Sequence, residues 1–188
     1  MSERIKQFLR NQRGFTLVEL LVVVIILAIL AAIMIPKLLP YTQQARISQT
    51  EDNLSTMRSI IEAYCVSAGQ GHYPTTGNPT NGGTGAPSNP TSVTQLGPGA
   101  DIAMVLQTGG VQWKPGGGIN DPWGDPYVYT PYLDSAGNVI GYSIVSAGPD
   151  KKAGDADDVF VSSNYSPQQG NVPANVSDGT AGTTEKSN

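Results

Sequence analysis

The sequence predicts an α+β protein, in which a long N-terminal helix packs against a small three-stranded antiparallel sheet. The first observation is a 21-residue run, 15–35, that is apolar or small except for Thr16 and Glu19. The second is a helical repeat of apolar residues that continues this run to about residue 67. The third is a set of three short β-type segments within 121–162, separated by turn sequences. Antiparallel strands that pack against one face of a helix form an α+β domain.

Residues 15–38 are predicted to form a transmembrane helix. A helix of 21 residues spans about 30 Å, the thickness of the hydrocarbon core of a bilayer. The preceding segment, 1–14, carries four basic residues and one acidic residue. Positively charged flanks stay on the cytoplasmic side. We therefore expect a single-pass membrane protein, with its N-terminus in the cytoplasm and its larger part across the membrane.

Glu19 is unusual because a carboxylate inside a membrane span is costly. In one interpretation the segment is a plain anchor, and Glu19 lies near the cytoplasmic headgroups. In the other, the chain is cleaved after Gly14, which creates a new amine on Phe15 one helical turn from Glu19. The carboxylate would then compensate that amine, or the amine of a neighbouring copy.

Residues 39–68 predict an amphipathic continuation of the helix. Pro36 and Pro40 remove backbone hydrogen bonds, so we expect a kink or a loosened helix around residues 32–40. Gly69 is expected to end the helix in a left-handed conformation. The predicted buried stripe comprises Ile47, Thr50, Leu54, Met57, Ile61 and Tyr64.

Residues 69–120 are predicted to form a Gly/Pro-rich loop and a short helix. Gly, Pro, Thr, Asn and Ser dominate 69–99, which we expect to be an exposed loop and a contact surface for other subunits or a partner. The short helix is expected at 101–107. His72, the single histidine, has no neighbour at metal-ligand spacing and is given no role.

Residues 121–162 are predicted to hold the sheet. Strands are expected at 127–132, 139–146 and 159–162, with a hairpin loop at 134–138. The turn-rich sequence D-P-W-G-D-P-Y precedes the first strand. The last segment, 163–188, is polar and is expected to be a flexible tail.

Composition excludes several classes of function. Of 11 basic and 15 acidic residues, the first 14 residues hold four and one, which leaves 7 basic and 14 acidic residues. Such a chain lacks the basic surface that nucleic acid binding requires. No nucleophile–base pair and no P-loop are visible, so an enzyme is not expected. Cys65 is alone, cannot close an intramolecular disulfide, and is predicted to be a small apolar residue on the inner face of the helix; an intermolecular bridge is the alternative.

The loop between the last two predicted strands carries four carboxylates within nine residues. They are Asp150, Asp155, Asp157 and Asp158. Hard cations such as Ca²⁺ prefer six to eight oxygen ligands, so one interpretation is a metal site. The other is a solvated acidic loop whose charge Lys151 and Lys152 partly offset.

The N-terminal motif R-G-F-T-L-V-E at 13–19, followed by a long Val/Ile/Leu/Ala helix, resembles the signal of type IV pilins and type II secretion pseudopilins. This resemblance implies that a prepilin peptidase cuts after Gly14 and that the new N-terminal Phe15 is methylated. It implies an assembly role for Glu19. Pro36 matches the helix-kinking proline of the family.

The sequence D-P-W-G-D-P-Y, a hairpin, and then S-x-G-x-D…D-A-D-D resembles the major pseudopilin of type II secretion systems. In that family a calcium ion holds the loop that a disulfide fixes in other pilins. The resemblance implies Asp150, Asp157 and Asp158 as side-chain ligands. The further ligands that we expect are backbone carbonyl oxygens near Val145 and Ser146 and the Asp155 side chain.

The resemblance implies a structural subunit of a pseudopilus that moves exoproteins across the outer membrane. The expected partners are copies of the chain, minor pseudopilins, the prepilin peptidase/methyltransferase, and an inner-membrane platform with a separate ATPase. The resemblance places the unprocessed protein in the bacterial inner membrane, and the processed protein would form a periplasmic or cell-surface filament. The alternative is the major pilin of a surface pilus for adhesion, motility or DNA uptake.

Overall fold

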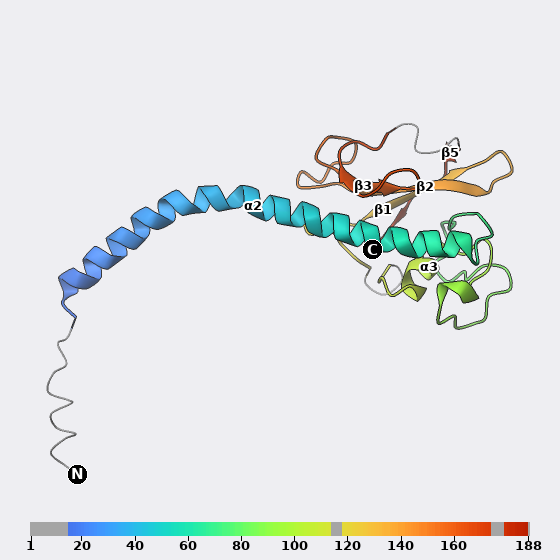
Figure 1. The fold of residues 1–188 in the computed structure, drawn as a ribbon, viewed down its shortest axis with the longest axis horizontal. Helices are drawn as coiled ribbons and strands as arrows, with labels where there is room; N and C mark the ends of the chain where they lie inside the picture. The colour runs from blue at the N-terminus through green and yellow to red at the C-terminus, as the bar shows by residue number, and fades with distance from the viewer. Residues whose placement is uncertain (1–14, 114–117, 174–178, 188) are drawn as a thin grey trace, which may run out of the picture. The chain divides into compact units, whose positions relative to one another are not determined.

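The computed structural model describes residues 15–113, 118–173 and 179–187. The chain divides into two compact units, Met1–Thr42 and Gln43–Asn188. Helix α2 (Leu17–Val66) precedes an antiparallel sheet, as Figure 1 shows. This arrangement confirms the predicted α+β class. The predicted leader, residues 1–14, lies outside the described residues.

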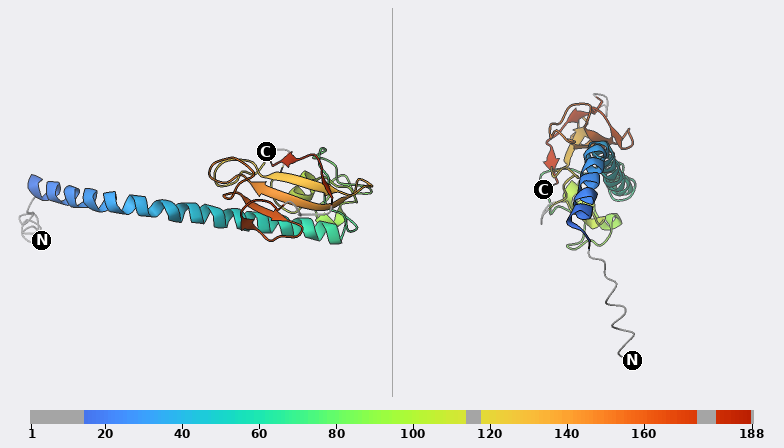
Figure 2. Two further views of the ribbon diagram at one scale, coloured as in Figure 1. Left: turned by 90° about the horizontal axis from the view of Figure 1, so that it is seen from above. Right: turned by 90° about the vertical axis from the view of Figure 1, so that its left-hand side faces the viewer.

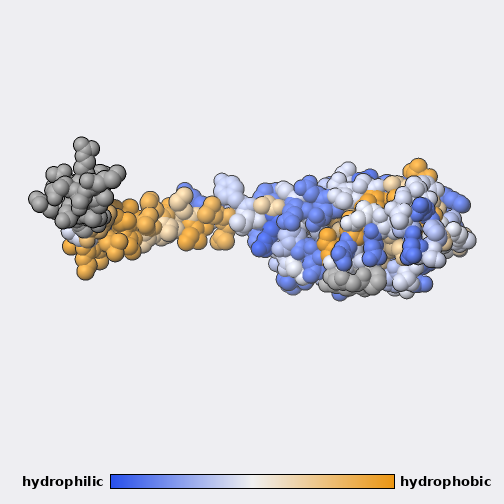
Figure 3. All heavy atoms as spheres, turned by 90° about the horizontal axis from the view of Figure 1, so that it is seen from below, coloured by the Kyte–Doolittle hydropathy of each residue, from blue (hydrophilic) through white to orange (hydrophobic). Residues whose placement is uncertain are grey.

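The first part of α2 exposes its apolar side chains on every face. Side chains from Leu17 to Leu39 are about half exposed or more, including Leu20, Ile29 and Ile35, and Figure 3 shows the apolar surface that they form. This stretch is long and apolar enough to cross a membrane, and none of it is buried. The helix continues through Pro36 and Pro40 without ending at either proline.

The second part of α2 buries the stripe that the periodicity predicts. Thr50, Leu54, Met57, Ile61 and Tyr64 are each 0% exposed, Cys65 is also buried, and Ile47 packs against the core. The helix ends at Val66, and the left-handed conformations fall on Gln70 and Gly71 rather than on Gly69. Gly69 is needed for a different reason, because a Cβ atom there would lie 2.3 Å from the His72 carbonyl oxygen.

The core of the second unit joins α2, the sheet and the segment that holds α3 (Ile102–Thr108). Figures 1 and 2 show both the sheet and this segment beside α2. Asp101 caps α3 by accepting a hydrogen bond from the Ala103 N–H, 2.9 Å away, which agrees with the predicted short helix. Buried members of the core include Leu54, Met57, Ile61, Ile102, Leu106, Trp113, Tyr127, Tyr129, Tyr142, Ile144, Val159 and Val161.

The segment 69–99 is less exposed than predicted. It contains the short 3-10 helix η1 (Val93–Gln95), and Leu96 and Ala100 pack in a second buried cluster with Tyr64. The Tyr64 hydroxyl donates to the Gly97 carbonyl and accepts from the Ala100 N–H, at 3.0 and 3.1 Å. A buried phenol on α2 thus fixes the end of a segment whose composition suggested only turns.

The sheet is built on three strands at the predicted positions. They are β1 (Val128–Leu133), β2 (Val139–Ser146) and β3 (Val159–Ser162). β1 pairs with β2 and β2 with β3, both antiparallel, and a register shift falls between Tyr132 and Leu133. The bounds of β2 and β3 agree with the prediction residue for residue.

The prediction of three strands and a flexible tail is corrected by the structure. The described part of the tail adds β4 (Gln168–Gln169), β5 (Thr180–Ala181) and β6 (Glu185–Lys186), so the sheet has six strands in the order β4-β3-β2-β1-β5, with β6 also on β1. These two-residue strands pair through backbone N–H and C=O groups. Every residue except proline carries both groups, so a polar segment can pair in this way. Glu185 and Ser187 are buried, and the Glu185 carboxylate accepts from the Gly77 N–H at 3.0 Å.

Candidate metal site and N-terminal motif

The start of α2 is fixed by a reciprocal pair of contacts between Thr16 and Glu19. The backbone N–H and the hydroxyl of Thr16 both donate to Glu19 Oε2 at 3.0 Å, and the Glu19 N–H donates to Thr16 Oγ1 at 3.2 Å. This arrangement is a capping box, which satisfies backbone donors at a helix start. Phe15 precedes it and is 78% exposed. Gly14, the predicted cleavage position, lies outside the described residues.

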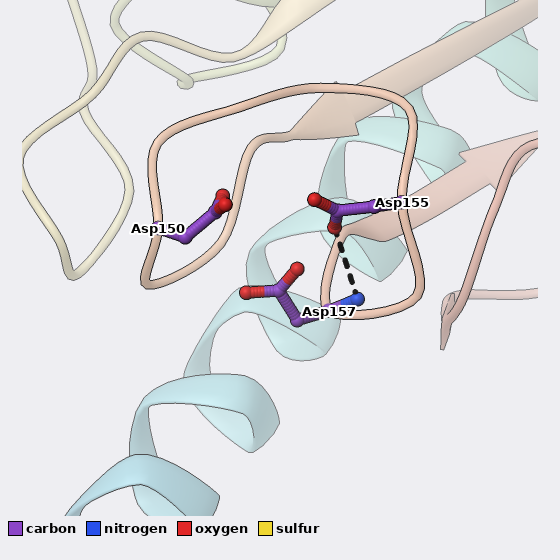
Figure 4. A group of neighbouring side chains, drawn as sticks. All are labelled: Asp150, Asp155 and Asp157. Atoms are coloured by element: carbon purple, nitrogen blue, oxygen red, sulfur yellow. Dashed lines mark hydrogen bonds between the residues drawn. The ribbon is translucent and has the colours of Figure 1, made fainter.

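The loop between β2 and β3 brings together three of the predicted ligands. Asp150, Asp155 and Asp157 each offer one carboxylate oxygen, and these oxygens lie within 4.8 Å of one another. Figure 4 shows this carboxylate cluster, in which the Asp157 N–H donates to Asp155 Oδ1 at 3.3 Å. Asp150 is exposed and the other two are half-buried, so the cluster is open to solvent.

Asp158 lies in the same loop but is fully buried. Its Oδ2 accepts from the backbone N–H groups of Gly154 and Asp155, at 2.6 and 3.2 Å. Its Oδ1 is buried without a hydrogen-bond partner among the described residues. A buried carboxylate oxygen in that state is costly unless a cation or a water satisfies it.

Electrostatics disfavours the ionised form of this loop. A hydrogen bond with the Asp155 side chain, partial burial, and the charges of Asp155 and Asp150 raise the pKa of Asp157. Burial raises the pKa of Asp158, against the opposing effect of its two backbone donors. In both cases the protein without a cation holds negative charge at a cost.

Val145 and Ser146 occupy the last positions of β2, opposite Phe160 and Val159 of β3. The Ser146 hydroxyl donates to Asp121 Oδ2 at 2.6 Å. The same hydroxyl accepts from the Gly148 N–H at 3.4 Å, so this side chain has a partner on each side of the strand end. The predicted contribution of Val145 and Ser146 through their carbonyl oxygens stays a prediction.

Asp121 is the buried centre of the turn before β1. Its Oδ1 accepts from the N–H groups of Trp123 and Asp125, at 3.0 and 2.9 Å, and its Oδ2 accepts from Ser146. Trp123 in turn donates from Nε1 to Gln43 Oε1 of α2 at 3.0 Å. Asp121 thus joins the turn to the strand end from which the acidic loop departs.

Gly148 closes the base of the acidic loop. It has a φ of +63°, and a Cβ atom there would lie 2.5 Å from the Asp157 carbonyl oxygen. The two ends of the loop approach each other closely only because this position has no side chain.

The donors present fit a hard divalent cation. The cluster supplies carboxylate oxygens, a fourth carboxylate has an unsatisfied buried oxygen, and the described residues of the loop include no thiolate or imidazole. All-oxygen donor sets suit Ca²⁺ or Mg²⁺ better than zinc or copper. Calcium tolerates irregular loop geometry, whereas Mg²⁺ demands a near-ideal octahedron.

Sequence reasoning missed the parts played by Thr16 and Asp121. The T-x-x-E pattern at 16–19 is a capping-box signature and could have been found. Asp121 at the head of a Pro/Gly turn indicates a side-chain cap on the turn, but its bond to Ser146 joins residues 25 positions apart, and no local pattern predicts it.

The fold and the N-terminal motif define a pilin-like protein, with one apolar helix leading into an α+β unit. The family described as the prokaryotic N-terminal methylation motif matches residues 9–35. Type II secretion system core protein G of Escherichia coli K12 is 30% identical over 149 residues, which cover 79% of this chain and 90% of that protein. The protein of the same name in Pseudomonas aeruginosa is 28% identical, over 79% of this chain and 91% of its own length.

A type IV major fimbrial protein, FimA of Dichelobacter nodosus, is 44% identical over 59 residues, or 31% of this chain and 37% of that protein. No solved structure matches the chain. The chain belongs to the family of type II secretion system core protein G, the major pseudopilin.

Proposed function

We propose that the protein is the major structural subunit of a type II secretion pseudopilus. The observations that carry the proposal are the match to core protein G over about four-fifths of the chain and the match to the N-terminal methylation motif at residues 9–35. The exposed apolar half of α2 supplies what a filament subunit needs, since it can lie in lipid before assembly and against other helices afterwards. Polymerisation of the subunit moves exoproteins across the outer membrane.

The N-terminal motif indicates how the subunit is processed and assembled. The chain enters the inner membrane with its basic end in the cytoplasm, and a prepilin peptidase/methyltransferase cleaves after Gly14 and methylates Phe15. Glu19 then faces the N-terminal amine of the adjacent subunit, with its carboxylate already oriented by Thr16. The partners in assembly are further copies of the chain, minor pseudopilins, and a membrane platform driven by a separate ATPase.

The test is complementation of a secretion-positive host that lacks its own major pseudopilin. Wild-type protein should restore the exoprotein to the medium, and Glu19→Ala should insert in the membrane but abolish filaments and secretion. Asp52→Ala, an exposed acidic position on the second part of α2, is the matched control and should behave as wild type. Normal filaments from Glu19→Ala would refute the assembly role. Surface pili with no secreted exoprotein would favour the pilus alternative.

The acidic loop is proposed to hold a structural calcium ion. Asp150, Asp157 and Asp158 would be side-chain ligands and Asp155 a further one, with carbonyl oxygens near Val145 and Ser146 completing the shell. Support comes from the carboxylate cluster and from the unpartnered Oδ1 of Asp158. The ion would neutralise the loop and tie the end of β2 to the start of β3.

The calcium proposal is tested by thermal unfolding of the full chain in detergent. The melting temperature should rise on adding Ca²⁺ to chelated protein, and equimolar Mg²⁺ should give a much smaller rise. Identical melting curves with Ca²⁺ and with chelator would indicate that the acidic loop is solvated and binds no calcium. The pseudopilus proposal would not be affected.

A further inference from the structure

Two adjacent lysines in the acidic loop reach different carboxylates. Lys151 Nζ lies 2.9 Å from Asp125 Oδ2, in the turn before β1 and outside the carboxylate cluster. Lys152 Nζ lies 3.7 Å from Asp150 Oδ2, which belongs to the cluster. The Lys152 backbone N–H also donates to Asp150 Oδ1 at 2.8 Å, so residue 152 contacts both oxygens of one proposed ligand.

The two ion pairs differ in how firmly they are held. The Lys151 and Asp125 side chains are 54% and 29% exposed, whereas those of Lys152 and Asp150 are 81% and 39% exposed. An exposed pair at 3.7 Å is weak and exchanges readily. A divalent ion can therefore displace the Lys152 ammonium from Asp150. The shorter ion pair with Asp125 keeps Lys151 away from the cluster.

We propose that Lys152 is a tethered cation that competes with a divalent ion for Asp150 and thereby sets the affinity of the loop for calcium. The inference rests on the calcium proposal above. When the divalent ion binds, the Lys152 ammonium leaves Asp150 for solvent. The measured binding free energy is therefore less favourable by the free energy needed to break this ion pair. The ammonium also repels a nearby dication, which acts in the same direction.

Lys152 suits this role because nothing in its surroundings makes it necessary for folding. With 81% of its side chain exposed, replacement by Gln removes little packing and keeps the backbone donor to Asp150. The effect of the substitution should thus fall on ion binding. Lys151→Gln is the matched control. It removes the same charge at the neighbouring position, from a lysine that pairs with Asp125 and not with Asp150.

The experiment is calcium titration of the full chain in detergent by calorimetry, at low and high ionic strength, with Ca²⁺ as the only ligand. At low ionic strength Lys152→Gln should lower the Kd two- to fivefold, the range expected for loss of an exposed ion pair. Lys151→Gln should change it by less than twofold, and Lys152→Arg should restore the wild-type value. At high ionic strength the difference between Lys152→Gln and wild type should shrink, because salt screens exposed charges.

The outcomes separate this inference from the calcium proposal. A Kd that is unchanged in Lys152→Gln, or lowered equally in Lys151→Gln, overturns the role of Lys152 and leaves the calcium site standing. Wild-type protein that binds no Ca²⁺ overturns both.

Discussion

Replacing Asp158 with Asn should abolish stabilisation by calcium while leaving the metal-free protein at least as stable as wild type. The amide oxygen of Asn can accept the two backbone hydrogen bonds from Gly154 and Asp155 that Asp158 Oδ2 accepts now. The substitution removes a buried negative charge whose second oxygen has no partner among the described residues. Burial raises the pKa of Asp158, so the ionised form opposes folding when no cation is bound.

The size of the effect follows from mass action. Calcium at 100 times its Kd should stabilise the wild-type protein by about 2.7 kcal/mol. In a unit of about 150 residues, each kcal/mol moves the melting temperature by roughly 2–4 °C. The wild-type protein should therefore gain about 5–10 °C on adding calcium, and Asp158→Asn should gain close to nothing.

The assay is thermal unfolding followed by circular dichroism, in chelator and in excess Ca²⁺. Asp134→Asn is the control: Asp134 is a half-buried acid in the β1–β2 turn, at the opposite end of β2 from the acidic loop. This variant should melt lower in both conditions but keep the full calcium shift. A wild-type shift in Asp158→Asn would refute Asp158 as a ligand. A metal-free Asp158→Asn protein that melts well below wild type would contradict the claim that the buried Asp158 charge opposes folding when no cation is bound.

Three further predictions concern the turn, the loop base and the core. Asp121→Ala removes three hydrogen bonds from a site 5% exposed and should cost about 3 kcal/mol in the urea-unfolding free energy, whereas Asp121→Asn should cost about 1; equal losses would contradict the reasoning. Gly148→Ala should weaken calcium binding at least tenfold because a Cβ atom meets the Asp157 carbonyl, whereas Gly137→Ala, also at positive φ but with open space around it, should leave the calcium Kd unchanged. Alkaline pH should destabilise the protein from about pH 10 upward: burial, the largest cause, raises the pKa of Tyr73 to about 12 in the folded state, so the unfolded chain loses its protons first. The urea midpoint should fall between pH 10 and 12, and a flat profile would argue against it; the other tyrosines whose pKa burial raises are Tyr64, Tyr127, Tyr129 and Tyr142.

Periodicity predicted the elements that bury apolar side chains and missed those that do not. The stripe from Thr50 to Tyr64 was visible because each member packs against the core, and β2 and β3 were visible because apolar and β-branched residues mark buried strands. The strands β4, β5 and β6 are two residues long and pair through backbone groups. Backbone pairing is insensitive to side-chain identity, so composition carried no signal for it.

The candidate site was predictable where its members lie close in sequence. Asp150, Asp155 and Asp157 occupy one short loop, and any closed form of that loop brings their carboxylates near each other. The bond between Asp121 and Ser146 and the ion pair between Lys151 and Asp125 depend on how the turn before β1 packs beside the end of β2. Such contacts follow from tertiary structure, which spacing alone does not encode.

The tail strands have a consequence for a protein that works as a polymer. A sheet with open edges offers unpaired N–H and C=O groups to any other chain, and many copies held side by side in a membrane would meet those edges constantly. Here β4 covers part of one edge, on β3, while β5 and β6 cover part of the other, on β1. Growth through sheets is thereby discouraged, which leaves the exposed apolar part of the helix as the surface for the assembly proposed above.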